Sequence, residues 1–169
     1  MKEIMERRSV RTYTSQPVPD ESLQRLLKAA MRAPSAGNSQ PWEFVVIRDR
    51  NMLDAIRIFH PYAAALRTAP CAIVVCGNLL RQIFPGYWVQ DCSAATENIL
   101  LEAVHLGLGA VWMGLHPTQE RVSDMSQLLG LPETVVPLCV IAVGFPAQEP
   151  PPIDTFHPEY VHFDRWDQY

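Results

Sequence analysis

Hydrophobic positions recur along the chain with periods that predict alternating helices and strands. Positions 23, 26, 27, 30 and 31 repeat at helical spacing within 20–33, and Asp20 stands at the expected N-cap. Apolar runs at 44–47, 72–76 and 135–143 predict internal strands, and 110–115 predicts a strand or strand-like loop. Pro137 places the start of the 135–143 strand at an edge or a bulge.

Residues 89–108 form the longest helical pattern, and this helix is apolar on nearly all of its faces. Such a helix needs more cover than one sheet provides, so we expect a subunit interface on it. Residues 52–69 predict two short helices broken at His60-Pro61, and 118–129 predicts a surface helix capped by Thr118.

Residues 146–158 are rich in proline and cannot form regular ladders, and aromatic residues follow at 160–166. This stretch has no core of its own, so we expect it to lie on a partner subunit. The chain therefore reads as one domain, 1–169, with 146–169 as an extended tail. Strands that alternate with helices predict an α+β sandwich in which helices cover a mixed sheet.

Composition supports one globular domain, because 48% of the 169 residues are hydrophobic and 19% are charged. The net charge of −4 argues against nucleic-acid binding. Cys71, Cys76, Cys92 and Cys139 lie in apolar segments and are interpreted as reduced core residues. No apolar run is long enough for a membrane span and the N-terminus carries no apolar leader, which predicts a cytoplasmic protein.

Two polar segments are the candidates for ligand binding. Arg7, Arg8 and Arg11 fall within five residues and predict an anion site, the alternative being a solvated basic turn. Residues 33–42 lie between a helix and a strand and predict a ligand-binding rim; the alternative is an ordinary connection of turn residues.

Signals for protein-borne catalysis are missing from the sequence. There is no nucleophile elbow and no Walker motif, and the histidines lack metal-ligand spacing. Gly107, Gly109 and Gly114 do not fit the dinucleotide fingerprint, because the third glycine comes too late. We therefore predict no metal site and no catalytic side chain, and expect a cofactor to carry the reaction.

The sequence Arg-Arg-Ser-x-Arg-x-Tyr at 7–13, followed by Ala-Pro-Ser-Ala-Gly-Asn-Ser-Gln-Pro-Trp at 33–42, resembles the flavin-dependent nitroreductase family. Weaker agreement extends through 107–114 to the tail at 161–166. The resemblance implies a three-layer sandwich with a four- or five-stranded mixed sheet. It also implies a homodimer that is built around the long helix and exchanges its C-terminal tails.

FMN is the cofactor that the resemblance implies, held at the dimer interface. Arg7, Arg8 and Ser9 would bind its phosphate and ribityl chain, and Arg11 would face the pyrimidine edge. A second group would reach the flavin of the other subunit: Pro34, Ser35, Ala36, Asn38 and Gln40. Backbone groups of a third would pass near the flavin N5: Trp112, Met113 and Gly114. The alternative for Trp112 and Met113 is ordinary core.

The implied activity is hydride transfer from NADH or NADPH to the flavin and on to nitroaromatic or quinone-type acceptors. Because the chain is too short for a separate nicotinamide-binding domain, both substrates would use one site in turn, by a ping-pong mechanism. Two alternatives stay open. One is a specialised flavin enzyme that dehydrogenates, dehalogenates or fragments flavin; the other is a flavin-binding module without turnover.

Two local features qualify the resemblance. Ile153 and Thr155 occupy places where small relatives carry basic residues that bind the phosphate, which predicts weaker FMN retention, with His157 as a substitute ligand. Segment 78–87 contains the candidate substrate-covering residues Phe84, Tyr87 and Trp88, the alternative being a simple surface loop.

Overall fold

The computed structural model describes residues 2–148, 151, 153 and 155–166. Its sheet has four strands: β1 (Trp42–Ile47), β2 (Cys71–Asn78), β3 (Gly109–Gly114) and β4 (Val135–Gly144). The strand order is β1-β2-β4-β3, and all three ladders are antiparallel. The expected mixed sheet is thus corrected: among the described residues, parallel pairing is confined to an isolated bridge between Ser9 and Ala110.

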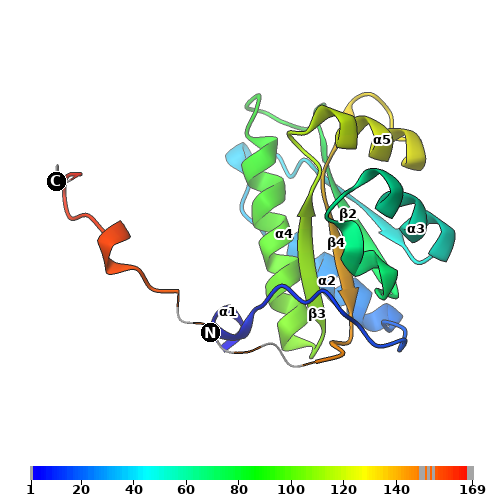
Figure 1. Cartoon of the computed structure of the whole chain (residues 1–169). Helices are drawn as coiled ribbons and strands as arrows, with labels where there is room; N and C mark the ends of the chain where they lie inside the picture. The colour runs from blue at the N-terminus through cyan, green and yellow to red at the C-terminus, as the bar shows by residue number, and fades with distance from the viewer. Residues whose placement is uncertain (1, 149–150, 152, 154, 167–169) are drawn as a thin grey trace.

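Helices cover both faces of the sheet, which confirms the three-layer α+β arrangement (Figure 1). One face carries α2 (Asp20–Ala30) and α4 (Trp88–His105); the other carries α3 (Arg50–Phe59), η2 (Ala63–Arg67) and α5 (Gln119–Leu129). The short helices α1 (Lys2–Glu6), η1 (Ala36–Asn38) and η3 (Pro158–Tyr160) lie outside these layers. Together, α3 and η2 confirm the predicted break at His60-Pro61.

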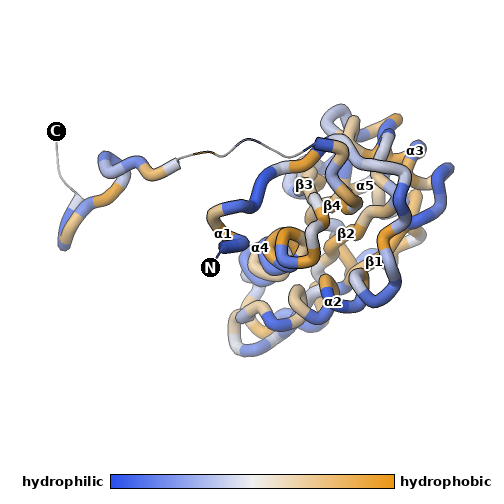
Figure 2. The backbone as a smooth tube through the Cα atoms, turned by 90° about the horizontal axis from the view of Figure 1, so that it is seen from below, coloured by the Kyte–Doolittle hydropathy of each residue, from blue (hydrophilic) through white to orange (hydrophobic). Residues whose placement is uncertain are grey.

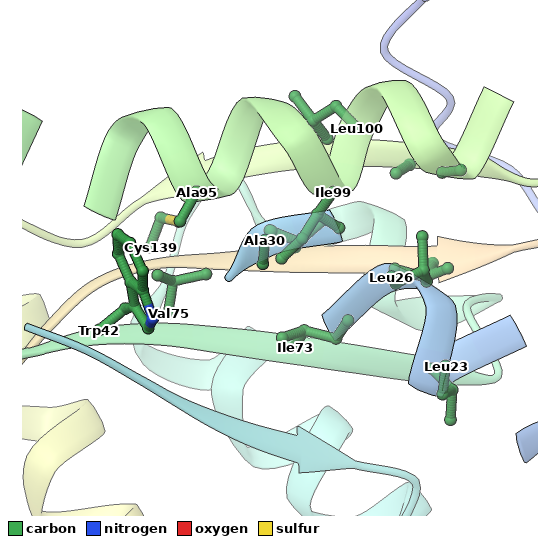
Figure 3. Close-up of a cluster of buried hydrophobic side chains, with 14 of the residues drawn as sticks. Leu23, Leu26, Ala30, Trp42, Ile73, Val75, Ala95, Ile99, Leu100 and Cys139 are labelled. Atoms are coloured by element: carbon green, nitrogen blue, oxygen red, sulfur yellow. The ribbon is translucent and has the colours of Figure 1, made fainter. Parts of the chain in front are cut away.

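Residues of β2 alternate between two cores, because successive side chains of a strand point to opposite faces. Cys71, Ile73 and Val75 join the core beneath α2 and α4, whereas Ala72 and Val74 join the other core. Figure 3 shows Ile73 and Val75 in the first of these cores. Both faces of this strand are therefore buried, which explains its continuous apolar run.

A bulge interrupts β4 where Pro137 lies, as predicted. Val75 pairs with Cys139 and Cys76 pairs with Pro137, so Leu138 is the extra residue. The Leu138 carbonyl turns to accept hydrogen bonds from the backbone N–H groups of Leu115 and His116, both at 3.0 Å. The bulge thereby fastens the chain that leaves β3.

Two sequence expectations about helix α2 need correction. Pro19 is its N-cap and Asp20 its first residue, whose carboxylate pairs with Arg48 instead of capping the helix. The helix ends at Ala30, three residues before Ala33. All four cysteines are free and buried, as expected, and burial raises the pKa of Cys71 to about 11 and that of Cys76 to about 12.

The tail leaves the body after β4, and residues 155–166 lie apart from it in Figures 1 and 2. Large apolar side chains of this stretch stay exposed, among them Phe156, Tyr160, Phe163 and Trp166.

Candidate functional site

The arginine segment, residues 7–11, lies along the outer edge of β3. Ser9 bridges Ala110, and the Val10 N–H donates to the Ala110 carbonyl at 3.0 Å. Gly109 permits this close approach, since a Cβ there would lie 2.7 Å from the Val10 side chain. Figure 2 shows the segment as a hydrophilic stretch after α1. A glycine and a backbone bridge thus hold three arginines beside an edge strand.

The guanidinium groups of this segment are bound mainly by uncharged oxygens. Arg8 donates to the carbonyls of Met5 (2.9 Å) and Arg7 (2.7 Å), and Arg11 donates to the Ser9 carbonyl at 3.2 Å. The one carboxylate within 4 Å of these arginines, among the residues described, is Glu97, 3.6 Å from Arg7 Nε. Net positive charge therefore remains for an anion.

A groove of about 730 Å³ opens between this segment and the start of the tail. Arg8 reaches across it to the carbonyls of Pro151 (3.1 Å) and Ile153 (3.4 Å). Its lining includes Arg7, Arg8, Ser9, Arg11, Ile153 and Thr155. The tail contributes no positive charge through Ile153 and Thr155, and the nearby His157 pairs with Glu159 at 3.0 Å.

The 34–40 loop is shaped by a buried carboxylate. Asp91, in the first turn of α4, accepts hydrogen bonds from the Ala36 N–H (2.9 Å) and the Ser39 hydroxyl (3.3 Å). Inside the loop, Ser35 Oγ accepts from the Gln40 N–H at 3.0 Å. The N-terminus of α4 favours negative charge at this position. Sequence reasoning missed the contact between Asp91 and the loop.

Left-handed backbone is concentrated in the same loop. Gly37 has φ +61°, and the non-glycine residues Asn38 and Gln40 have φ +55° and +47°. The Gln40 side chain donates to Asn38 Oδ1 at 2.9 Å. Such conformations are uncommon outside glycine and are characteristic of ligand-binding loops.

The end of β3 presents backbone rather than side chains. The Met113 side chain is buried, Trp112 is half-buried against the core under α4, and Gly114 is exposed. Because Ala110 faces the Val10 N–H and strand residues alternate, the backbone groups of Trp112 and Gly114 also point away from β4. Those of Met113 point toward β4. Trp112 and Gly114 are therefore the residues able to offer backbone N–H groups to a ligand.

Two side chains that sequence reasoning missed bind the Gly114 carbonyl. His60 Nε2 lies 3.0 Å from this oxygen, and Arg121 donates to it at 3.3 Å. Because the Tyr62 N–H donates to His60 Nδ1 at 3.2 Å, the imidazole proton resides on Nε2. Burial lowers the pKa of His60, against the opposing effect of the bond to Gly114. The sequence signal at His60-Pro61 indicated only the helix break.

The covering segment, residues 78–87, packs over the 34–40 loop. Phe84 Cε2 would lie 2.9 Å from a Cβ on Gly37, and the Phe84 and Tyr87 rings meet edge to face at 6.2 Å. Both rings are half exposed. Trp88 corrects the expectation: it is only 7% exposed and fills the space above Gly77, so it belongs to the core.

The chain holds the predicted site residues in two places on α4. The 34–40 loop is tied to Asp91 at the helix start, whereas α1 and the arginine segment contact Glu97 and His105 further along. Asp91 and His105 are about 21 Å apart along the axis, at 1.5 Å per residue. The groove beside the arginines is lined by α1, the arginine segment and the tail, without residues of the 34–40 loop.

The described residues contain no group of three or more His, Cys, Asp or Glu arranged to hold a metal ion. Within the same residues, no helix is long and apolar enough to cross a bilayer.

Comparison with known proteins identifies relatives over nearly the whole chain. The model of the nitroreductase family matches residues 4–60 and 58–145. A "Putative NADH dehydrogenase/NAD(P)H nitroreductase" of Methanothermobacter thermautotrophicus is 47% identical over 96% of this chain and 85% of its own length. A protein of Archaeoglobus fulgidus with the same description is 45% identical over 98% of this chain and 98% of its own length.

Comparison with solved structures also finds a nitroreductase. The FMN-dependent nitroreductase of Clostridium difficile R20291 superposes with a TM-score of 0.90 at 28% identity, over 98% of this chain and all of its own. The match therefore spans every layer of the fold.

Proposed function

The chain belongs to the nitroreductase family, and from this premise we propose that it is an FMN-dependent oxidoreductase that takes electrons from NADH or NADPH. The observation that carries the proposal is the arginine segment along the outer edge of β3: its surplus positive charge lies beside Ala110, and the backbone N–H groups of Trp112 and Gly114 face outward further along the same edge. FMN, when bound, supplies the hydride chemistry, which would explain why the chain needs no acid, base or nucleophile set.

The residues present fit FMN by charge and by spacing. Arg7, Arg8 and Ser9 would hold the phosphate and ribityl chain, because three arginines line the groove and only one carboxylate, that of Glu97, lies within 4 Å of them among the described residues. Arg11 would face the pyrimidine edge. Ala110, next to Ser9, and Gly114 are about 13 Å apart along an extended strand, which separates the phosphate end from the backbone donors of Trp112 and Gly114.

Each site is proposed to use two subunits. The 34–40 loop lies at one end of α4 and the arginine segment further along, so Pro34, Ser35, Ala36, Asn38 and Gln40 would reach a partner's flavin. The exposed aromatic residues of 156–166 support docking of the tail on that partner. Sedimentation should give the mass of a dimer, and a monomer at all concentrations would contradict the proposal.

Mixing two defective variants tests the shared site directly. Arg8→Met damages the arginine segment and Asp91→Ala damages the 34–40 loop. In a mixed dimer with shared sites, one site has both elements intact, so mixing should restore tight FMN binding to a fraction of sites. If each site used a single subunit, every site would stay defective and mixing would restore nothing.

FMN is proposed to bind less tightly than it would with basic residues in the tail, since Ile153 and Thr155 line the groove without charge. Titration of the apoprotein with FMN measures this, and a nanomolar or tighter Kd would contradict it. Ile153→Lys should strengthen binding, whereas a lysine at the exposed Ile58 on α3 should not.

The reductant and the acceptor, a nitroaromatic or a quinone, are proposed to occupy one site in turn, with Phe84 and Tyr87 covering it. The first experiment is an absorption spectrum before and after anaerobic NADH or NADPH. Flavin bands that disappear on addition support the proposal; stable bands would indicate a flavin-binding module without turnover. Steady-state kinetics should give parallel double-reciprocal lines, and intersecting lines would exclude the ping-pong scheme.

A further inference from the structure

Gly114 ends the edge strand β3, and this residue type by itself adds little restraint to the backbone. Glycine has the widest backbone freedom, and a Cβ at this position would meet only the His116 carbonyl, at 4.0 Å. Its backbone groups also point away from β4. Nevertheless its carbonyl accepts hydrogen bonds from two side chains that belong to two other elements.

His60 is the more tightly held of the two donors. It caps α3, its backbone N–H donates to the Ile56 carbonyl at 3.0 Å, and its residue is 1% exposed. The Tyr62 N–H occupies Nδ1, which leaves the Nε2 proton for the Gly114 carbonyl. Both ring nitrogens are thus bound, so the orientation of the imidazole is set before any ligand arrives.

Arg121 reaches the same oxygen from α5. Its guanidinium also lies over the Tyr62 ring, 5.2 Å from the centroid, which restrains its position. The chain around His60 therefore orients both donors: Tyr62 contributes its backbone N–H to one and its ring to the other.

We propose that His60 and Arg121 are positioning residues for the Gly114 peptide, and that through it they set the backbone donors offered to the flavin. The inference rests on the proposed function, because it assumes that FMN lies along the end of β3. Without the two donors, the Gly114 carbonyl loses both of its side-chain partners, and the end of β3 beside the Gly114 N–H is held only by its pairing with β4 and by the bonds of Leu115 and His116 to Leu138. FMN would still find the arginine segment but would meet a less ordered strand end.

Hydrogen exchange on the FMN-free protein tests the arrangement itself. His60→Leu removes the donor at similar volume, and His60→Gln keeps an amide donor at a comparable reach. Exchange of the Leu115 and His116 amides should be about tenfold faster in His60→Leu, as expected for a loss of about 1.4 kcal/mol. His60→Gln should stay within about threefold of the wild type. Leu53→Ala, at a buried position of the helix that His60 caps, controls for global destabilisation.

FMN titration separates positioning from a purely structural role. For His60→Leu, the Kd of oxidised FMN and the Kd of dithionite-reduced FMN should rise by different factors, the larger about tenfold. His60→Gln should recover most of the wild-type values. Equal changes in both constants, no larger than those of Leu53→Ala, would overturn the proposal.

Arg121→Met provides a second route if His60→Leu does not fold, because this side chain is half-buried and contributes through one long hydrogen bond. It should change exchange and FMN affinity in the same direction, by about threefold. Unchanged exchange and unchanged constants would refute the inference. A wild-type protein that binds no FMN would refute the proposed function instead, while exchange at Leu115 and His116 would still test the positioning.

Discussion

The 34–40 loop and the arginine segment are held in place by different kinds of interaction. The loop is tied by side chains: Asp91 accepts from the Ala36 N–H and the Ser39 hydroxyl, and Ser35 accepts from the Gln40 N–H. The arginine segment is tied by backbone pairing along β3, and its guanidinium groups find mostly carbonyl oxygens.

This difference separates a preformed element from one that a ligand completes. The loop makes these polar contacts within the chain, so its shape is expected to be the same with and without FMN. The arginine segment keeps unpaired positive charge, which costs self-repulsion until an anion arrives. Variants of the segment should therefore change FMN affinity with little effect on stability, whereas variants of the loop should lower stability as well as weaken FMN binding.

The largest expected effect is on FMN affinity in Arg8→Met. A charge-assisted hydrogen bond to phosphate contributes about 1.5–3 kcal/mol, which corresponds to roughly 10- to 150-fold weaker binding. Stability should change little, because the side chain is bound to exposed carbonyls. Fluorescence titration of the apoprotein with FMN measures the effect. Arg67→Met, which removes the same charge from η2, is the control. A Kd within twofold of the wild type would contradict this prediction.

Asp91→Ala should affect the 34–40 loop and lower the stability of the protein. It leaves the Ala36 N–H and the Ser39 hydroxyl without their acceptor, which costs about 1–3 kcal/mol of unfolding free energy. Urea denaturation measures the loss, and the loop amides should exchange faster. Asp124→Ala, a half-buried acid on α5, controls for the change of charge. Equal stability of the two variants would show that Asp91 does not organise the loop.

Gly37→Ala tests the loop backbone on a smaller scale. The φ of +61° costs a side chain about 1–2 kcal/mol, and the Phe84 ring at 2.9 Å adds a contact. Gly130→Ala separates the two causes, because Gly130 has φ +63° with open space around it. In the background of Phe84→Ala, the cost at Gly37 should fall to that at Gly130. A cost that persists would assign the whole effect to the backbone.

The smallest expected effect is the pH dependence of stability contributed by His60. Burial lowers its pKa in the folded protein below the usual 6.5, while the Arg121 charge acts in the same direction and Tyr62 and Gly114 contribute uncharged partners. The unfolded chain therefore takes up the proton first, so stability should be lost as pH falls below 6.5. His60→Gln should flatten this part of the curve, measured by urea midpoints between pH 7.5 and 5.5.

Hydrophobic periodicity determined the helices and strands, because it depends only on residues that are close together in the sequence. Continuous apolar runs predicted β2 and β4, the helical pattern that is apolar on nearly all faces predicted α4, and Pro137 predicted an edge or a bulge at the start of β4. The candidate segments 7–11 and 33–42 were also visible, since clusters of charge and of turn residues need no partner to be noticed.

Tertiary structure alone decided which groups hold those segments. Asp91 and the loop residue Ala36 are 55 positions apart, and His60 and Gly114 are 54 apart; no local pattern links them. Trp88 was misassigned for the same reason, because its burial depends on the absence of a side chain at Gly77 on another element. Period and composition report what a residue's own element can bury, whereas hydrogen-bond partners depend on how helices and strands pack against one another.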